Sequence, residues 1–304
     1  MASRIIVNGM HVPLKIYTSE AGFLARFWTH LRKAVGSMHS DGCFGIAKGA
    51  AYSALLAFFP VLTTTAALLV QANARAVART IARLLYDVVP PGTEDIVSAL
   101  FQVNRTRPTS LLVIAILLST WAGSGVMMSL MEGFRAIYRI PQERRFLHER
   151  AVAMGLVFAT ALPVLGASGL IVFGNRAQRW VISLLVSSDG GDLRGWVRLA
   201  GQGVTFLLAV GAIVMATALV YYFGPNRKQS FASVFPGAIL ATFLWLLATL
   251  AFSWYVRHVT NYNLLYGSVG AGLALLVWMY VLSVVSLLGC EFNAMRDKIE
   301  PEHG

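Results

Sequence analysis

A short polar segment near the C-terminus carries the side chains best suited to bind a ligand. Residues 257–272 read RHVTNYNLLYGSVGAG and lie between two apolar runs, each long enough to cross a bilayer. Asn261, Tyr262, Asn263 and Tyr266 supply amide and phenol groups, which can form hydrogen bonds with the polar headgroup of a lipid. The segment is therefore a candidate binding site, because polar groups at membrane depth are functional candidates. An interfacial turn with tyrosine anchors is the alternative, and it is the more common structure.

Glycines and prolines mark the places where the apolar runs depart from regular helix packing. Gly267, Gly270 and Gly272 open the run after the polar segment, and positions without a side chain let another helix approach closely. Pro60 and Pro163 lie inside the first and third runs, where each removes one backbone hydrogen bond. Such a proline either kinks the span or helps to form a mid-membrane site, as in transporters. The structural kink is the more common outcome.

A row of arginines follows the first apolar run. Arg75, Arg79 and Arg83 fall on one face of the first of two amphipathic helices that the pattern predicts within residues 74–103. Such a row can bind lipid phosphates through charge-assisted hydrogen bonds. A solvated basic face is the alternative interpretation.

These residues must be positioned by membrane-spanning helices, because the composition is far from that of a soluble protein. Of the 304 residues, 57% are hydrophobic and only 13% are charged. The formal charge of +11 comes from Lys and Arg spread over the loops, a pattern that sets membrane topology and favours anionic lipid, not nucleic acid, as partner. The sequence therefore predicts an all-α polytopic membrane protein with six transmembrane helices, at about residues 49–70, 110–131, 151–173, 203–223, 234–256 and 267–290.

The predicted organisation is a single membrane domain with two short flanking segments. Residues 1–45 form a cytoplasmic N-terminal segment with an interfacial amphipathic helix from Ser19 to Val35, residues 46–293 form the six-helix domain, and residues 294–304 form a cytoplasmic tail. Lys and Arg are more numerous on the side of the two termini than on the other side. Both termini are therefore predicted to be cytoplasmic.

The chain lacks the usual signatures of enzymes. The six histidines show no metal-ligand spacing, and neither a phosphate-binding GxxxxGK[ST] loop nor a GxSxG nucleophile elbow occurs. We therefore predict no catalytic residues, no metal, no cofactor and no enzymatic activity. Glu291, close to the inner surface, is expected to form a structural ion pair with Lys48 or Arg296.

Five stretches together resemble the YihY/BrkB family of bacterial inner-membrane proteins, over roughly residues 25–296. They are AKGAAYSALLAFFPVL (47–62), GFRAIYRIPQERRFLHERAVA (133–153), YYFGPNRK (221–228) with PGA (236–238), FSWYVRHVTNYNLLYGSVGAGLALLVWMY (252–280) and LGCEFNA (288–294). The resemblance implies a multi-pass protein of the bacterial plasma (inner) membrane, connected with envelope biogenesis, serum resistance and movement of envelope lipids. It also implies that the ribonuclease name once given to the family is a misassignment.

Two functional hypotheses follow. The first is a transporter-like protein that moves an anionic lipid or related amphiphile across or out of the inner membrane. In this hypothesis the arginine row and the polar segment bind the headgroup. The alternative is a non-transporting scaffold that recruits envelope-assembly partners, with a second copy of the chain as a further candidate partner. Nuclease activity is disfavoured, because the chain has no metal-ligand set and no basic groove with interleaved aromatic residues.

Overall fold

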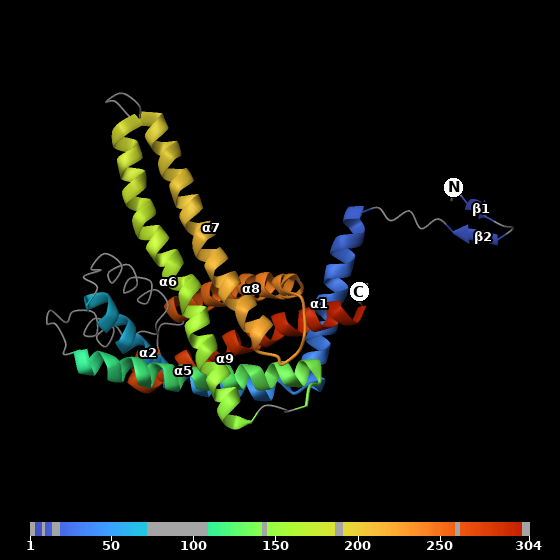
Figure 1. Cartoon of the computed structure of the whole chain (residues 1–304), viewed down its shortest axis with the longest axis horizontal. Helices are drawn as coiled ribbons and strands as arrows, with labels where there is room; N and C mark the ends of the chain where they lie inside the picture. The colour runs from blue at the N-terminus through green and yellow to red at the C-terminus, as the bar shows by residue number, and fades with distance from the viewer. Residues whose placement is uncertain are drawn as a thin grey trace.

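The structure is a computed structural model that describes residues 4–7, 10–13, 19–71, 109–141, 145–185, 191–258 and 262–299. Within these residues it has a two-stranded antiparallel hairpin and seven helices (Figure 1). The elements are β1 (Arg4–Val7), β2 (Met10–Pro13), α1 (Ser19–Ser40), α2 (Cys43–Gln71), α5 (Thr109–Tyr138), α6 (Phe146–Leu185), α7 (Gly191–Phe223), α8 (Phe231–His258) and α9 (Tyr262–Ile299).

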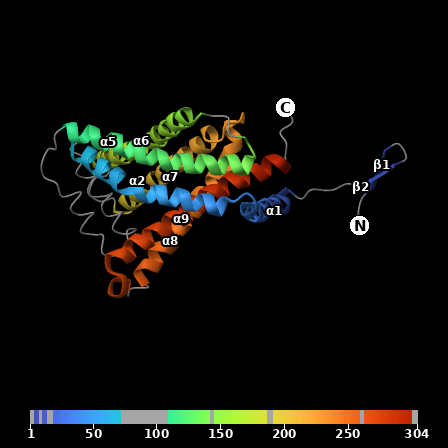
Figure 2. The ribbon, with the colours of Figure 1, turned by 90° about the horizontal axis from the view of Figure 1, so that it is seen from below.

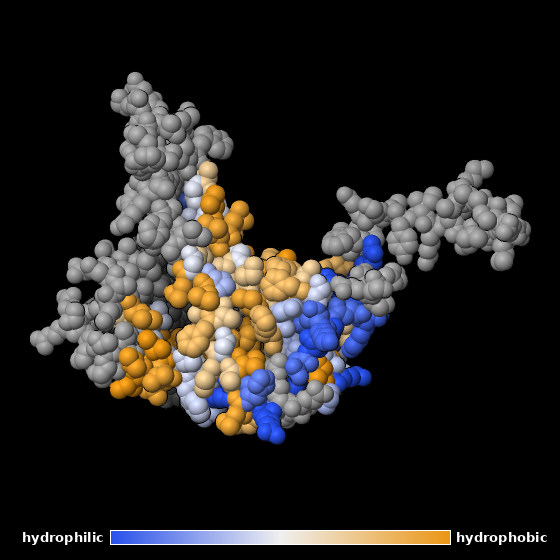
Figure 3. All heavy atoms as spheres, in the orientation of Figure 1, coloured by the Kyte–Doolittle hydropathy of each residue, from blue (hydrophilic) through white to orange (hydrophobic). Residues whose placement is uncertain are grey.

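Six of these helices are long and apolar enough to cross a membrane: α2, α5, α6, α7, α8 and α9. Large apolar side chains remain exposed on all six, which suits a surface that faces lipid. Hydrophilic residues gather at the end of the molecule where α1 meets the C-terminal part of α9 (Figure 3). The predicted helical membrane fold with six spans is confirmed. The two short strands pair only with each other and add nothing to the helical body.

The helices are longer than the apolar runs that predicted them. The third predicted span ends at residue 173, whereas α6 continues to Leu185, and the sixth begins at residue 267, whereas α9 begins at Tyr262. Hydropathy falls where polar residues begin, but polar residues can continue a helix. Residues 175–185 contain neither glycine nor proline, so no residue there stops α6.

The helices form two groups that meet at α5 and α8. Helix α2 packs along α5 and α9, and α8 packs along α9 (Figure 2). Helices α6 and α7 run side by side and extend away from the other helices (Figure 1). Helix α6 also contacts α5, and α7 contacts α8, so this pair joins the body only near one end.

Helix α1 is predicted to lie on the membrane, but it packs part of its apolar face on protein. Phe27 and Leu31 pack against Phe292 of α9, and the two phenyl rings lie 5.4 Å apart. Trp28 stays 66% exposed. The chain turns from α1 into α2 at Gly42, whose φ of 69° falls in the left-handed region that glycine adopts without strain.

Two spans approach each other very closely where α8 crosses α9. A Cβ atom at Gly289 would lie 2.7 Å from the Gly237 carbonyl oxygen, and a Cβ atom at Gly237 would collide with the Gly289 carbonyl oxygen. The two backbones therefore touch, as small residues permit in membrane helices. The PGA and LGCEFNA stretches, at 236–238 and 288–294, form this crossing.

An asparagine side chain completes the backbone hydrogen bonding of α8 at this crossing. Pro236, early in α8, has no N–H group and disturbs the preceding turn. The buried Asn293 amide of α9 accepts a hydrogen bond from the Gly237 N–H (2.7 Å) and donates one to the Val234 carbonyl (3.0 Å). The two helices are therefore joined by polar as well as by van der Waals contacts.

We expect the Asn293→Ala substitution to destabilise the protein by about 2–3 kcal/mol, because it leaves two buried backbone groups without these partners. The measurement is thermal unfolding of the purified protein in detergent. Asn293→Asp keeps an acceptor for the Gly237 N–H but has no donor for the Val234 carbonyl, so it should give a lower unfolding temperature than the wild type too. An alanine variant that unfolds at the wild-type temperature would show that these bonds contribute no net stability.

Candidate ligand-binding cavity

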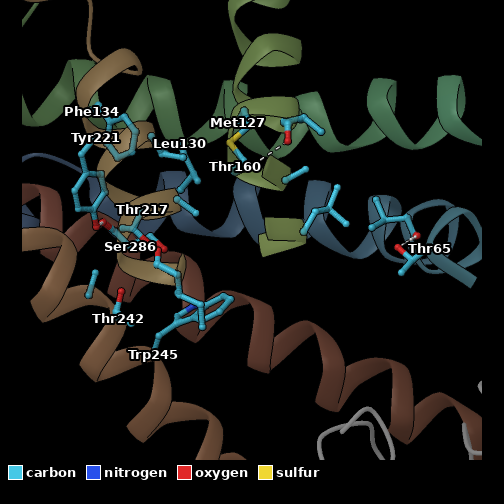
Figure 4. Close-up of a pocket in the computed structure, with 18 of the residues that line it drawn as sticks. Thr65, Met127, Leu130, Phe134, Thr160, Thr217, Tyr221, Thr242, Trp245 and Ser286 are labelled. Carbon is cyan, nitrogen blue, oxygen red and sulfur yellow. Dashed lines mark hydrogen bonds between the residues drawn. The ribbon is translucent and has the colours of Figure 1, made fainter. Parts of the chain in front are cut away.

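A cavity of about 640 Å³ lies between the α6–α7 pair and the other spans (Figure 4). Its volume falls within the range of about 300–1,000 Å³ that is usual for small-molecule sites. All six spans contribute to its wall, which is formed by Val61, Thr65, Leu68, Met127, Leu130, Phe134, Val157, Thr160, Ala161, Leu165, Ile213, Ala216, Thr217, Val220, Tyr221, Ala241, Thr242, Trp245 and Ser286.

The wall of the cavity is almost entirely apolar. None of the residues that form it carries a formal charge. An ionised group would therefore be desolvated in the cavity without a compensating charge, which is costly. Hydrocarbon, in contrast, would exchange one apolar environment for another. The cavity suits the apolar part of a membrane amphiphile better than an anionic headgroup.

Most of the polar side chains of the wall gather at one end, whereas Thr65 and Thr160 lie elsewhere along it. Figure 4 shows Thr217, Tyr221, Thr242, Trp245 and Ser286, from α7, α8 and α9, at the opposite end of the cavity from Thr65. Each of these helices supplies at least one hydroxyl group. Three separate apolar runs thus bring polar side chains to one place.

Most of these hydroxyl groups already donate their proton to protein. The Thr217 hydroxyl donates to the Ile213 carbonyl (2.9 Å), and the Ser286 hydroxyl donates to the Leu282 carbonyl (2.9 Å). The Tyr221 hydroxyl crosses between helices and donates to the Ser286 carbonyl at 2.5 Å. These bonds fix the orientation of the side chains and leave oxygen lone pairs available.

Aromatic packing closes the cavity at the same end. The rings of Phe134 and Tyr221 meet edge to face, with centroids 5.5 Å apart and an interplanar angle of 89°. Both side chains are buried, and both belong to the wall of the cavity. The Tyr221 hydroxyl also lies against Gly289, so this closure rests on the crossing of α8 and α9.

A cluster of ionisable side chains lies beyond this closure, toward the C-terminal end of α9. Glu291 is fully buried, and among the described residues its two carboxylate oxygens have no hydrogen-bond partner. The charges that act on it belong to Asp41, Lys298 and Arg139, and Asp41 and Arg139 form an ion pair at 3.6 Å. The predicted pairing of Glu291 with Lys48 or Arg296 is therefore wrong. The Arg296 guanidinium instead donates to the Ser233 carbonyl, which the crossing brings within reach.

Several residues of the sequence-predicted site lie outside the described residues. These are Arg75, Arg79, Arg83 and Asn261. Tyr262, Asn263, Tyr266 and Gly267 belong to the first turns of α9, not to a loop before it. Their role in binding a headgroup remains a prediction.

The glycines and prolines predicted from the sequence have different surroundings. Gly270 is buried, whereas Gly272 is exposed, and no described atom lies within 4 Å of the position of a Cβ atom there. Helices α2 and α6 continue through Pro60 and Pro163 without a break. Both prolines adjoin the cavity in sequence, since Val61 follows Pro60 and the wall residues Ala161 and Leu165 flank Pro163.

The hydroxyl residues that the structure brings together at the closed end of the cavity are not part of the predicted site. Thr217, Thr242 and Ser286 lie in three different apolar runs, and each run contains other Ser or Thr residues, such as Thr205, Thr249 and Ser283, so no sequence signal singles them out. The described part of the chain also contains no candidate metal site, since no group of three or more His, Cys, Asp or Glu side chains there could hold a metal ion.

Comparison with known proteins gives one family. The family model described as virulence factor BrkB matches residues 34–303. The ribonuclease-like protein YfkH of Bacillus subtilis is 28% identical over 253 residues, which cover 82% of this chain and 88% of YfkH. A UPF0761 membrane protein of Coxiella burnetii is 28% identical over 253 residues, covering 83% of this chain and 87% of that protein. Another UPF0761 membrane protein, from Alkalilimnicola ehrlichii, is 26% identical, and the match covers 83% of this chain but only 55% of that protein. No solved structure matches the chain.

Proposed function

Because this chain belongs to the virulence factor BrkB family, we propose that it is a transporter-like membrane protein that moves or handles an anionic lipid or related amphiphile. The chain itself is a multi-pass membrane protein, and its relatives are bacterial proteins named as membrane proteins, which is consistent with the bacterial inner membrane. The observation that supports the proposal most is the cavity of about 640 Å³ between the α6–α7 pair and the other spans. A scaffold has no need of such a cavity.

In this proposal the two parts of the amphiphile bind at different places. The uncharged wall takes hydrocarbon, whose apolar surface matches that of the cavity. The anionic headgroup remains outside it, where the predicted arginine row Arg75, Arg79 and Arg83 and the amides of Asn261 and Asn263 would bind it. No step of this activity is enzymatic.

Reconstitution tests the proposal directly. Liposomes that contain the purified protein and a fluorescent phosphatidylglycerol in both leaflets are treated with dithionite, which bleaches only the outer leaflet. We expect the protected inner-leaflet fluorescence to decay faster with the protein than in protein-free liposomes. Fluorescent phosphatidylcholine, which has no net charge, should be moved more slowly.

The opposite result would favour the scaffold. If inner-leaflet fluorescence decays as slowly with the folded protein as without it, and the protein carries envelope-assembly proteins with it through purification, the transport proposal fails. Under that outcome the exposed part of α1, where Trp28 projects, would be the first surface to test for partners.

A further inference from the structure

We propose that the closed end of the cavity is a binding site for the ester carbonyl of a glycerol-linked acyl chain, with the Thr242 hydroxyl as the donor. This inference rests on the proposed function, since it names the group that an amphiphile places in the cavity. It goes further than the proposed function, because it requires an ester bond between the glycerol and the acyl chain. A protein could move amphiphiles without recognising that bond.

Among the described residues, Thr242 carries the only buried hydroxyl oxygen that has no hydrogen-bond partner. Its side chain is only 3% exposed, and among the described residues its Oγ1 atom has no hydrogen-bond partner. A threonine within a helix usually donates to the carbonyl four residues earlier, as Thr63, Thr160 and Thr217 all do. A buried hydroxyl without a partner costs free energy, which a ligand can recover.

Thr242 brings this unpartnered hydroxyl to the border of the cavity. Its side chain belongs to the wall, and Figure 4 shows it beside Ser286 and Trp245 at the closed end. Of the buried polar atoms without a partner in the described residues, the Thr242 hydroxyl is the one that a wall residue supplies. The two neighbouring hydroxyls, of Thr217 and Ser286, already donate to carbonyls of their own helices.

The chemistry of the wall limits which chemical group of a ligand Thr242 would bind. The group must accept a hydrogen bond, because the Thr242 proton is the one left without an acceptor. It must be uncharged, because no charged side chain lies in the wall. It must also be joined directly to hydrocarbon, because apolar side chains form most of the rest of the wall. An acyl ester carbonyl meets all three conditions, whereas a phosphate fails the second.

The test compares ester-linked with ether-linked phosphatidylglycerol of the same chain length. The two lipids differ at the carbonyl oxygen, so any difference in affinity reports on its recognition. The full-length protein in detergent is titrated with each lipid, and bound lipid is counted by native mass spectrometry. We expect the wild type to bind the ester lipid about three- to tenfold more tightly, as the loss of one neutral hydrogen bond implies.

Three variants assign this preference to one hydroxyl group. Thr242→Val keeps the shape of the side chain and should remove the preference, whereas Thr242→Ser keeps the hydroxyl and should retain it. Thr63→Val is the matched control, because Thr63 donates to the Phe59 carbonyl and is not part of the wall. It should leave the preference unchanged.

The outcomes separate this inference from the proposed function. Equal wild-type binding of both lipids, or equal weakening of both by Thr242→Val, would overturn the ester site and leave a lipid-handling protein. If neither lipid binds the wild type, both proposals fail. A Thr242→Val protein that keeps the full ester preference would also refute the assignment to Thr242.

Discussion

We expect the Gly289→Leu protein to fail to accumulate in folded form, because a side chain at residue 289 would force α8 and α9 apart. A Cβ atom there would lie 2.5 Å from the Tyr221 hydroxyl oxygen and 2.7 Å from both the Ala241 Cβ atom and the Gly237 carbonyl oxygen. The last two atoms cannot move unless α8 moves as well. Overpacking costs about 1–3 kcal/mol or more, and a displaced Tyr221 would lose its bond to the Ser286 carbonyl, worth about 1 kcal/mol. The leucine side chain adds three further carbon atoms to this clash.

The measurement is the yield of monodisperse protein on size-exclusion chromatography, together with its thermal unfolding in detergent. Gly272→Leu is the matched control on the same helix, since Gly272 is exposed and no described atom lies within 4 Å of its Cβ position. That variant should fold and gain up to about 1 kcal/mol from higher helix propensity. If the two variants behaved alike, α8 and α9 would not be in contact at Gly289.

The contrast between these glycines shows what a single sequence can predict. Three closely spaced glycines, 267, 270 and 272, predict close helix approach, yet Gly272 meets no described neighbour. The approach that the structure shows lies at Gly237 and Gly289, which are far apart in the sequence and in different helices. A glycine pattern shows where approach is sterically allowed, but only the pairing of helices decides where it occurs.

The same reasoning explains which parts of the fold were predictable. A bilayer requires about 20 apolar residues in each spanning helix, so hydropathy alone gives the six spans. Helix ends depend on local stop signals and on packing instead. For that reason α9 begins at Tyr262, inside the segment predicted as a connector, and α6 runs on to Leu185. Polar residues at these ends lower the hydropathy without stopping the helix.

The cavity could not be predicted, because its wall combines residues from six helices. Thr217, Thr242 and Ser286 are separated by long apolar stretches, and each would be a simple helix hydroxyl in its own run. What distinguishes Thr242 is the missing hydrogen bond, which is a property of the packed structure and not of its neighbours in sequence. Polar groups in the membrane are functional candidates, but their partners become visible only after the helices assemble.

The Ala216→Trp substitution is expected to reduce phosphatidylglycerol movement by about tenfold or more, down to the rate of protein-free liposomes. Ala216 belongs to the wall, on α7, and an indole ring at this position would occupy space that the proposal assigns to hydrocarbon. Any lipid chain would then have to displace packed side chains, and overpacking of about 1–3 kcal/mol corresponds to a large loss of occupancy. The rate is measured in the same dithionite assay.

Met215→Trp separates the effect of a filled cavity from that of an added ring. Met215 is the neighbour of Ala216 on α7, but its side chain is 39% exposed and does not belong to the wall. This control should move lipid at the wild-type rate, and both variants should show wild-type unfolding temperatures to within a few degrees. Wild-type transfer by a folded Ala216→Trp protein would mean that lipid does not pass through this cavity. The route would then have to lie on the outer surface of the helices, and the cavity would lose its place in the proposed function.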